Sequence, residues 1–209
     1  GLPGVTSLSP ALPVLWGEIR YGPPTSQEDQ LHVGDVFDRV KGTHERSEPE
    51  RVEIIDFRPE HADAFRQMNL DWITHYWEVE DGDRFYLDRP KERILDPGGA
   101  ILMALYDGEV VGTVALIPIG EGAYELAKMA VDEAARGKGI GWRLGSAVLD
   151  RAREVGAKRV FLESNTILEP AINLYRKLGF TPVRGSTSPY DRCNIQMEVW
   201  LSEADSETV

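Results

Sequence analysis

The chain has 209 residues, and its 42% hydrophobic and 28% charged content is that of a soluble globular protein with one sizeable core. Thirty-five acidic and 23 basic residues give a net charge of −12, which argues against a nucleic-acid partner, since such proteins need a basic surface. A single cysteine, Cys193, excludes an intramolecular disulfide, and no apolar run approaches the roughly 20 residues that span a bilayer. We therefore expect a cytoplasmic protein without a membrane partner.

The first 50 residues differ in composition from the rest of the chain. They contain six of the 13 prolines and an acidic polar run, and they show no sustained helical period. The chain's start also lacks the basic segment of a signal peptide. We predict an extension and linker over residues 1–50, packed either on the core or on a partner, then one domain over 51–203 and a tail over 204–209.

From residue 51 onward, short β-type runs alternate with helical patterns. Residues 59–77 begin with a proline and repeat apolar side chains every three or four positions, which predicts a helix with one apolar face. That face comprises Ala62, Phe65, Met68, Trp72 and Tyr76. Two further helices are predicted over 140–155 and 169–178. Strands are predicted over 51–57, 100–106, 109–119, 123–131, 158–164 and 193–201. This order predicts a single α/β domain with a mixed sheet.

Three alternating glycines lie at the start of the 140–155 helix, in the stretch ARGKGIGWRL. They are Gly137, Gly139 and Gly141. Their G-x-G-x-G spacing fits neither a Walker loop nor the G-x-G-x-x-G dinucleotide fingerprint. A helix N-terminus with unpaired N–H groups and two adjacent cations, Arg136 and Lys138, favours a pyrophosphate ligand. The alternative is a loop that is rich in glycine only because it turns sharply.

The pattern Arg136-x-x-Gly139-x-Gly141, followed by LYRKLGF at 174–180, resembles the GNAT family of acetyl-coenzyme A-dependent acetyltransferases. The signature of that family is [R/Q]-x-x-G-x-[G/A] after its fourth strand. The similarity covers roughly 150 residues and leaves the N-terminal extension outside. It implies a GNAT-like α/β (α+β) domain with a mixed, mostly antiparallel sheet of about seven strands, flanked by helices. Strands four and five of this sheet would splay apart.

The resemblance implies acetyl-CoA as co-substrate, with its pantetheine arm between the splayed strands. A backbone N–H at Met129 would polarise the acetyl carbonyl, and the N–H groups of the glycine stretch would hold the pyrophosphate. The implied cofactor-binding residues are Met129, Ala130, Val131, Arg136, Gly137, Lys138, Gly139, Ile140, Gly141, Trp142 and Asn165. The alternative for Asn165 is that it is an ordinary turn residue. The alternative for the Met129 sulfur is that it only packs in the core.

Tyr175 is the candidate general acid. It occupies the position on the second conserved helix where family members often carry a tyrosine beside the cofactor sulfur. A phenol with a pKa of about 10 can give its proton to a departing thiolate whose conjugate acid has a pKa of about 8.5. The alternative is a core residue next to Leu174 and Leu178.

Glu125 is the candidate general base, because an amine must lose its proton before it attacks an acyl group. It lies 11 residues before Arg136, the spacing at which histone-type members of the family place their catalytic glutamate. Strand alternation predicts that Glu125, Ala127 and Met129 share one face. A water chain could replace Glu125 as the base. Glu125 would then be a sheet-face carboxylate paired with a cation such as Lys128 or Arg192.

These features predict an N-acetyltransferase in which an amine attacks acetyl-CoA directly in a ternary complex. The acceptor would be a primary amine on a small molecule or peptide, with Trp72, Tyr76 and Tyr190 as a candidate aromatic wall. Arg192 would bind an acceptor carboxylate or, alternatively, form an ion pair. We expect no metal, because no Cys/His cluster is present, and a homodimer is compatible with the fold. The rival function is a non-catalytic acyl-CoA-binding sensor or assembly module.

Overall fold

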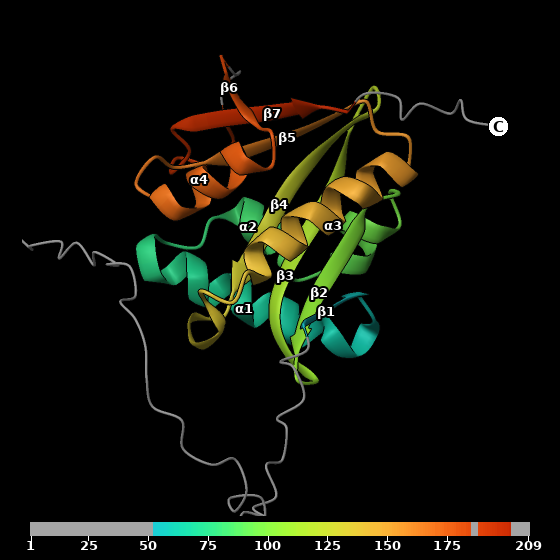
Figure 1. Ribbon diagram of the computed structural model, residues 1–209, viewed down its shortest axis with the longest axis vertical. Helices are drawn as coiled ribbons and strands as arrows, with labels where there is room; N and C mark the ends of the chain where they lie inside the picture. Colours follow the sequence, from blue (N-terminus) through green and yellow to red (C-terminus); the bar gives the residue numbers. More distant parts are fainter. Residues whose placement is uncertain (1–51, 185–187, 202–209) are drawn as a thin grey trace, which may run out of the picture. The chain divides into compact units, whose positions relative to one another are not determined.

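The computed structural model describes residues 52–184 and 188–201. The predicted N-terminal extension and the C-terminal tail lie outside these residues. The described part forms one seven-stranded mixed sheet in the order β1-β2-β3-β4-β5-β7-β6, flanked by helices (Figure 1). The predicted fold class is therefore confirmed. None of the helices in the described residues is both long and apolar enough to cross a membrane.

The elements follow the predicted order closely. The strands are β1 (Val52–Asp56), β2 (Ala100–Tyr106), β3 (Glu109–Gly120), β4 (Ala123–Val131), β5 (Arg159–Ser164), β6 (Thr181–Val183) and β7 (Ile195–Trp200). The α-helices are α1 (Ala62–Tyr76), α2 (Asp81–Leu87), α3 (Ile140–Glu154) and α4 (Glu169–Lys177). Three single turns complete the described chain: η1 (Pro59–His61), η2 (Lys91–Leu95) and η3 (Glu133–Ala135). The sequence analysis did not predict α2 or η2.

Two apolar layers cover the two faces of the sheet. Helices α3 and α4 pack on one face, where Leu144, Val148 and Ile172 are buried. Helices α1 and α2 pack on the other face, where Phe65 and Leu87 are buried. Figure 1 shows α3 in front of the sheet and α1 behind it. Amphipathic helices bury their apolar stripes in this way because the sheet offers an apolar surface on both sides.

The buried face of α1 differs from the predicted one. Phe65, Asn69 and Ile73 form the buried stripe, whereas Trp72 is half-buried and Tyr76 is exposed. Asn69 tolerates this burial because its amide donates a hydrogen bond to the Phe65 carbonyl oxygen, at 2.9 Å. A polar residue therefore occupies a core position. The neighbouring aromatic side chains, Trp72 and Tyr76, line the cavities described below.

Strands β4 and β5 are parallel and splay apart, as predicted. Their pairing covers only Ala123–Glu125 of β4, opposite Arg159, Val160 and Phe161 of β5. Beyond Glu125, β4 pairs only with β3 and β5 pairs only with β7. The second half of β4 therefore presents an open backbone edge toward β5.

A β-bulge in β4 corrects the prediction that Glu125, Ala127 and Met129 share a face. The register with β3 jumps so that Lys128 and Met129 together oppose one residue of β3, and Lys128 has a φ of 51°. Ala127 packs with the α1 layer, whereas Met129 packs with the α3 layer. The extra residue reverses the alternation, so Glu125 and Met129 lie on opposite faces.

Candidate active site

The predicted pyrophosphate loop has the geometry of an open helix N-terminus. Gly139 is the N-cap of α3 with a φ of 74°, and Gly137 has a φ of 82°, so both need the left-handed conformation that glycine adopts without strain. The first N–H groups of α3 have no acceptor within the helix. Ile140 is buried, so only its backbone faces this end of the helix, while the Trp142 side chain is 47% exposed.

The two cations of the loop differ in their contacts. Lys138 donates a hydrogen bond to the Tyr106 hydroxyl at 2.9 Å, and its Nζ atom lies 4.3 Å from the centroid of that ring. Arg136 forms only a long, exposed ion pair with Glu133, at 3.9 Å. Arg136 also lines the adjoining cavity, so it is the better placed of the two cations for an anionic ligand.

The first cavity, called here the α4 cavity, lies between the open edge of β4 and helix α4. Its lining includes Met129, Ala130, Val131, Arg136, Gly141 and Tyr175. Six of the predicted cofactor and catalytic residues therefore face a single cavity. A Cβ atom on Gly141 would lie 3.3 Å from Leu174 and 3.8 Å from Met129, so a glycine keeps this end of the cavity open.

We expect Gly141→Val to block the α4 cavity without unfolding the domain. Gly141 has ordinary helical backbone, so the new side chain adds bulk and little strain. The affinity for coenzyme A should fall by about 5- to 150-fold, in line with the loss of a few optimal contacts of about 1–3 kcal/mol in total. Calorimetry with coenzyme A measures this change. Ala147→Val on the same helix is the control, and an equal loss there would contradict a specific blockage.

The register of β4 defines which backbone groups reach the open edge. Asp132 donates its N–H to the Val111 carbonyl oxygen at 2.8 Å, so its backbone groups point toward β3. Val131, one residue earlier, points its N–H and C=O the opposite way, and Met129 follows by the same alternation. Both residues therefore offer backbone hydrogen bonds to a ligand between β4 and β5.

Tyr175 is buried in the layer beneath α4, with its ring edge-on to Phe180 at 6.0 Å between centroids. Burial raises the pKa of its hydroxyl to about 12. The phenol therefore keeps its proton throughout the physiological pH range. Packing in the core and lining of the α4 cavity occur together, so the two predicted interpretations of Tyr175 do not exclude each other.

Asn165 has both side-chain groups engaged within the protein. Its amide donates to the Arg192 carbonyl oxygen at 2.7 Å, and its oxygen accepts from the Ile167 N–H at 3.0 Å. This is the turn geometry that the sequence left open as the alternative. Asn165 does not line the α4 cavity but faces the second cavity, on the other side of the splayed strands.

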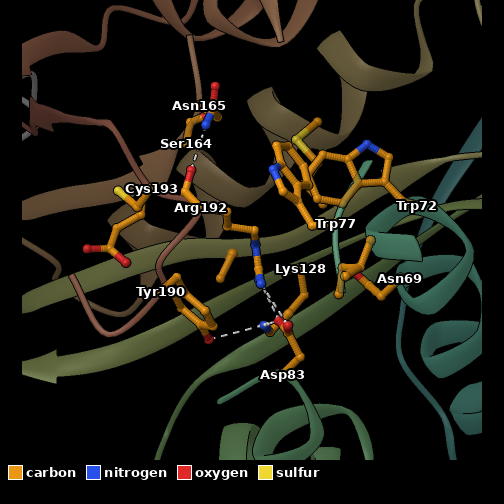
Figure 2. A pocket seen from close by; sticks show the side chains of 14 residues that line it. Asn69, Trp72, Trp77, Asp83, Lys128, Ser164, Asn165, Tyr190, Arg192 and Cys193 are labelled. Atoms are coloured by element: carbon orange, nitrogen blue, oxygen red, sulfur yellow. Dashed lines mark hydrogen bonds and ion pairs between the residues drawn. The ribbon is translucent and has the colours of Figure 1, made fainter. Parts of the chain in front are cut away.

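The second cavity, called here the α1 cavity, lies against α1, the bulge of β4 and the segment before β7 (Figure 2). Its lining includes Trp72, Trp77, Asp83, Lys128, Glu163 and Arg192. Met129 and Trp72 line both cavities. The two cavities therefore meet beside the β4 bulge, where a ligand from each side could touch.

A cluster of ion pairs forms one wall of the α1 cavity. Arg192 donates to both carboxylate oxygens of Asp83, at 2.7 and 2.9 Å, and to Glu80 at 2.7 Å. Lys128 donates to Asp83 at 2.8 Å and to the Tyr190 hydroxyl at 3.3 Å. Figure 2 shows Lys128 and Arg192 converging on Asp83, with the Tyr190 hydroxyl beside Lys128. The cluster joins α2, the β4 bulge and the segment before β7, which are far apart in sequence.

Burial and charge act in opposite directions on this cluster. Burial alone would raise the pKa of the fully buried Asp83, but the hydrogen bonds and charges of Arg192 and Lys128 outweigh it and lower the pKa. Burial lowers the pKa of the Lys128 amine, and the charge of Asp83 offsets part of this effect. Of the two predicted roles of Arg192, binding of an acceptor carboxylate or an ion pair within the protein, the structure shows the ion pair.

Glu125 lies at the fork where β4 and β5 separate. The pKa of its carboxyl group is raised to about 7, chiefly by burial and also by the nearby Glu163 carboxylate, while Lys128 lowers it in part. Glu125 is not among the residues that line either cavity, so any exchange of protons with a ligand would pass through water. The predicted ion pair with Lys128 or Arg192 is not seen, because both cations contact Asp83 instead.

Sequence reasoning missed several residues of the α1 cavity, including Asp83, Glu163 and Trp77. Asp83 lies on a short helix that no sequence pattern predicted, and Glu163 alternates on β5 without a distinguishing motif. The predicted aromatic wall is divided, with Tyr76 on the α4 cavity, Tyr190 on the α1 cavity and Trp72 on both. In the described part of the chain, no group of three His, Cys, Asp or Glu side chains is arranged to hold a metal.

The described residues combine a seven-stranded mixed sheet, a splayed parallel pair and a glycine-rich helix N-terminus beside it. The model of the acetyltransferase (GNAT) family matches residues 63–180. The chain therefore belongs to the GNAT family, and it is an acyltransferase enzyme.

Among curated proteins, the N-acetyltransferase YjgM of Escherichia coli, described as uncharacterized, is 37% identical over 117 residues, which are 53% of this chain and 70% of YjgM. The IAA acetyltransferase of Azospirillum brasilense is 38% identical over 122 residues, or 54% and 79% of the two chains. Among solved structures, a GNAT acetyltransferase of Staphylococcus aureus superposes with a TM-score of 0.65 at 22% identity, over 71% of this chain and 98% of that one. These structures share the fold.

Proposed function

We propose that this enzyme transfers the acetyl group of acetyl-CoA to a primary amine, by direct attack of the amine within a ternary complex. The observation that carries the proposal is that two cavities, one on each side of the splayed strands, meet at Met129 and Trp72. The α4 cavity would hold the coenzyme and the α1 cavity the acceptor. The amine and the thioester then meet without an intermediate on the protein.

Coenzyme binding rests on the α3 N-terminus and the open edge of β4. The N–H groups of residues 137–141 would hold the pyrophosphate with Arg136 beside it, and the backbone of Met129 and Val131 would bind the pantetheine arm. YncA from Salmonella typhimurium, solved with acetyl-CoA, superposes on this chain with a TM-score of 0.57 at 21% identity, over 76% of this chain and 98% of that one. No metal takes part in the proposed reaction.

The amine must lose two protons, one before it attacks and one after. Raising the Glu125 pKa from 4.5 to about 7 brings it closer to an amine with a pKa of about 10.4, so proton transfer becomes about 3 kcal/mol less unfavourable. We assign Glu125 as the general base, acting through water in the α1 cavity. Attack on the acetyl carbon produces an oxyanion that an N–H on the open β4 edge stabilises.

The C–S bond then breaks and leaves a thiolate. Tyr175 would donate a hydrogen bond to this sulfur as the thiolate departs, and the thiolate would take up its proton from solvent. With a pKa of about 12, the phenol is a weak acid toward a thiolate whose conjugate acid has a pKa of about 8.5. Its contribution is therefore mainly a hydrogen bond to developing charge.

We expect Tyr175→Phe to lower kcat by about 10- to 100-fold, the value of one hydrogen bond to a charged group. The affinity for coenzyme A should stay within about threefold, because the new ring keeps the packing against Phe180. Steady-state kinetics and calorimetry measure the two quantities separately. Equal losses of turnover and affinity would assign Tyr175 to packing or binding instead of catalysis.

Release of free coenzyme A in the presence of a panel of amines tests the proposal. Coenzyme binding without thiol release on any acceptor would instead favour a non-catalytic acyl-CoA sensor. Initial rates at varied concentrations of both substrates test the ternary complex, which predicts intersecting double-reciprocal lines. Parallel lines would indicate an acetyl-enzyme, for which Cys193 in the α1 cavity is the available thiol.

A further inference from the structure

We propose that the α1 cavity selects amines that carry no carboxylate, so that the acceptor is an alkyl- or arylalkylamine instead of an amino acid. This inference rests on the proposed function, because it assigns the α1 cavity to the acceptor. It follows from how the charged groups of the cavity are already paired, from the carboxylates that remain, and from the side chains that line the rest of the wall.

The two cations of the α1 cavity are held by carboxylates of the protein. Arg192 meets Asp83 through two parallel N–H bonds and meets Glu80 through a third, with all three at 2.7–2.9 Å. Lys128 contacts the same Asp83 at 2.8 Å. Two positive charges thus face two negative charges at close range. A carboxylate on an acceptor would have to compete with these buried partners, and it would pay for desolvation without gaining a free cation.

The remaining ionisable groups around the cavity add negative charge. Glu163 lines the wall, where it accepts hydrogen bonds from Gln196 at 2.7 Å and Ser188 at 2.9 Å. Glu125 lies close enough to Glu163 that this carboxylate contributes to the raised pKa of Glu125. The site therefore attracts an ammonium group and repels a carboxylate.

Aromatic side chains provide the rest of the surface. Trp72 and Trp77 line the cavity with their ring centroids 5.6 Å apart, and Figure 2 shows the two indoles side by side. Ile73 and Ala127 add apolar wall. Indole faces suit both an apolar or aromatic body and a cation. An acceptor with an apolar body and one ammonium group matches all of these features.

Matched pairs of acceptors that differ only by a carboxylate test the inference. Suitable pairs are tryptamine and tryptophan, tyramine and tyrosine, and phenethylamine and phenylalanine. We expect kcat/KM to be at least 30-fold higher for the amine in the pair that fits best. Calorimetry on the protein loaded with coenzyme A should give the same order of affinities. An amino acid that binds or reacts as well as its amine would overturn the inference.

The binding measurement separates this inference from the proposed function. Tighter binding of the amines without release of coenzyme A would support the selectivity and contradict the proposed activity. Release of coenzyme A with amino acids as the better acceptors would support the proposed activity and contradict the selectivity. If no member of any pair bound at millimolar concentration, the assignment of the α1 cavity to such amines would be wrong.

Glu80→Gln provides a second test, because it removes one of the charges that neutralise Arg192 and keeps a hydrogen-bond acceptor in place. The ratio of kcat/KM for the amine to kcat/KM for its amino acid should fall by at least fivefold. Glu78→Gln, two residues earlier on an exposed side chain, makes the same change of charge away from Arg192 and should leave the preference unchanged. Equal effects of the two variants, or none from Glu80→Gln, would overturn the role given to the ion pairs.

Discussion

Glu125→Gln is expected to lower kcat by about 10²- to 10³-fold at pH 7, the range that a positioned general base supplies. The substitution keeps the size of the side chain and removes its capacity to accept a proton. Because the Glu125 pKa is raised to about 7, the wild-type kcat/KM should rise with pH as this carboxyl group loses its proton. It should then level off until the pKa of the amine is reached.

The shape of the pH profile distinguishes a base from a structural residue. In the Gln variant the inflection near pH 7 should vanish, and the rate should rise about tenfold per pH unit toward the pKa of the amine, of about 10.4 for a lysine-like amine. Glu109→Gln, an exposed carboxylate on β3, is the control and should leave the profile unaltered. An inflection near pH 7 that persists without Glu125 would remove this residue from the reaction.

Asp83→Asn is expected to destabilise the domain by about 3–5 kcal/mol, because it leaves Arg192 and Lys128 without their shared carboxylate. Asp83 is completely buried, so water cannot replace the lost charge. Urea unfolding at pH 7 measures the difference. The folded-state pKa of Asp83 lies below its unfolded value of 3.8, so its contribution is present above that value and disappears as the pH falls through the folded pKa. The difference between variant and wild type should therefore shrink in acid.

Asp88→Asn is the matched control for this effect. Asp88 also pairs with an arginine, Arg66, at 2.9 Å, but both side chains are largely exposed. Surface ion pairs contribute about 0–1 kcal/mol, so this variant should unfold almost like the wild type. A loss below about 1 kcal/mol in Asp83→Asn would show that the cluster tolerates an unpaired cation. The argument for a neutralised Arg192 would then fail as well.

Much of the fold was predictable because its signals are local. The strands at 100–106 and 123–131 have the predicted bounds, and the helix that begins at Ile140 follows the predicted glycines. The prediction of the α1 face was wrong, since Asn69 replaces Trp72 in the buried stripe. Periodicity shows that a helix has an apolar side, but tertiary packing determines which of two overlapping stripes is buried.

The candidate site shows the same contrast between features set by neighbouring residues and features set by tertiary packing. The glycine-rich start of α3 beside the α4 cavity was predictable from sequence, because the helix N-terminus and its glycines are neighbours along the chain. The acceptor side was not, because Glu80, Asp83, Lys128 and Arg192 are brought together from segments up to 112 residues apart. The roles of Glu125 and Tyr175 stay predictions, to which the structure adds their burial and raised pKa values.

The sequence by itself determined the family, the order of the elements and the glycine-rich start of α3. The reason is that the conformation of a glycine and the free N–H groups of a helix depend on adjacent residues. Only the tertiary structure decided on which face of β4 each side chain lies, because one extra residue at Lys128 reverses the alternation of the sequence pattern. It also decided that Arg192 is neutralised, since ion pairs depend on distances in space that sequence order does not encode.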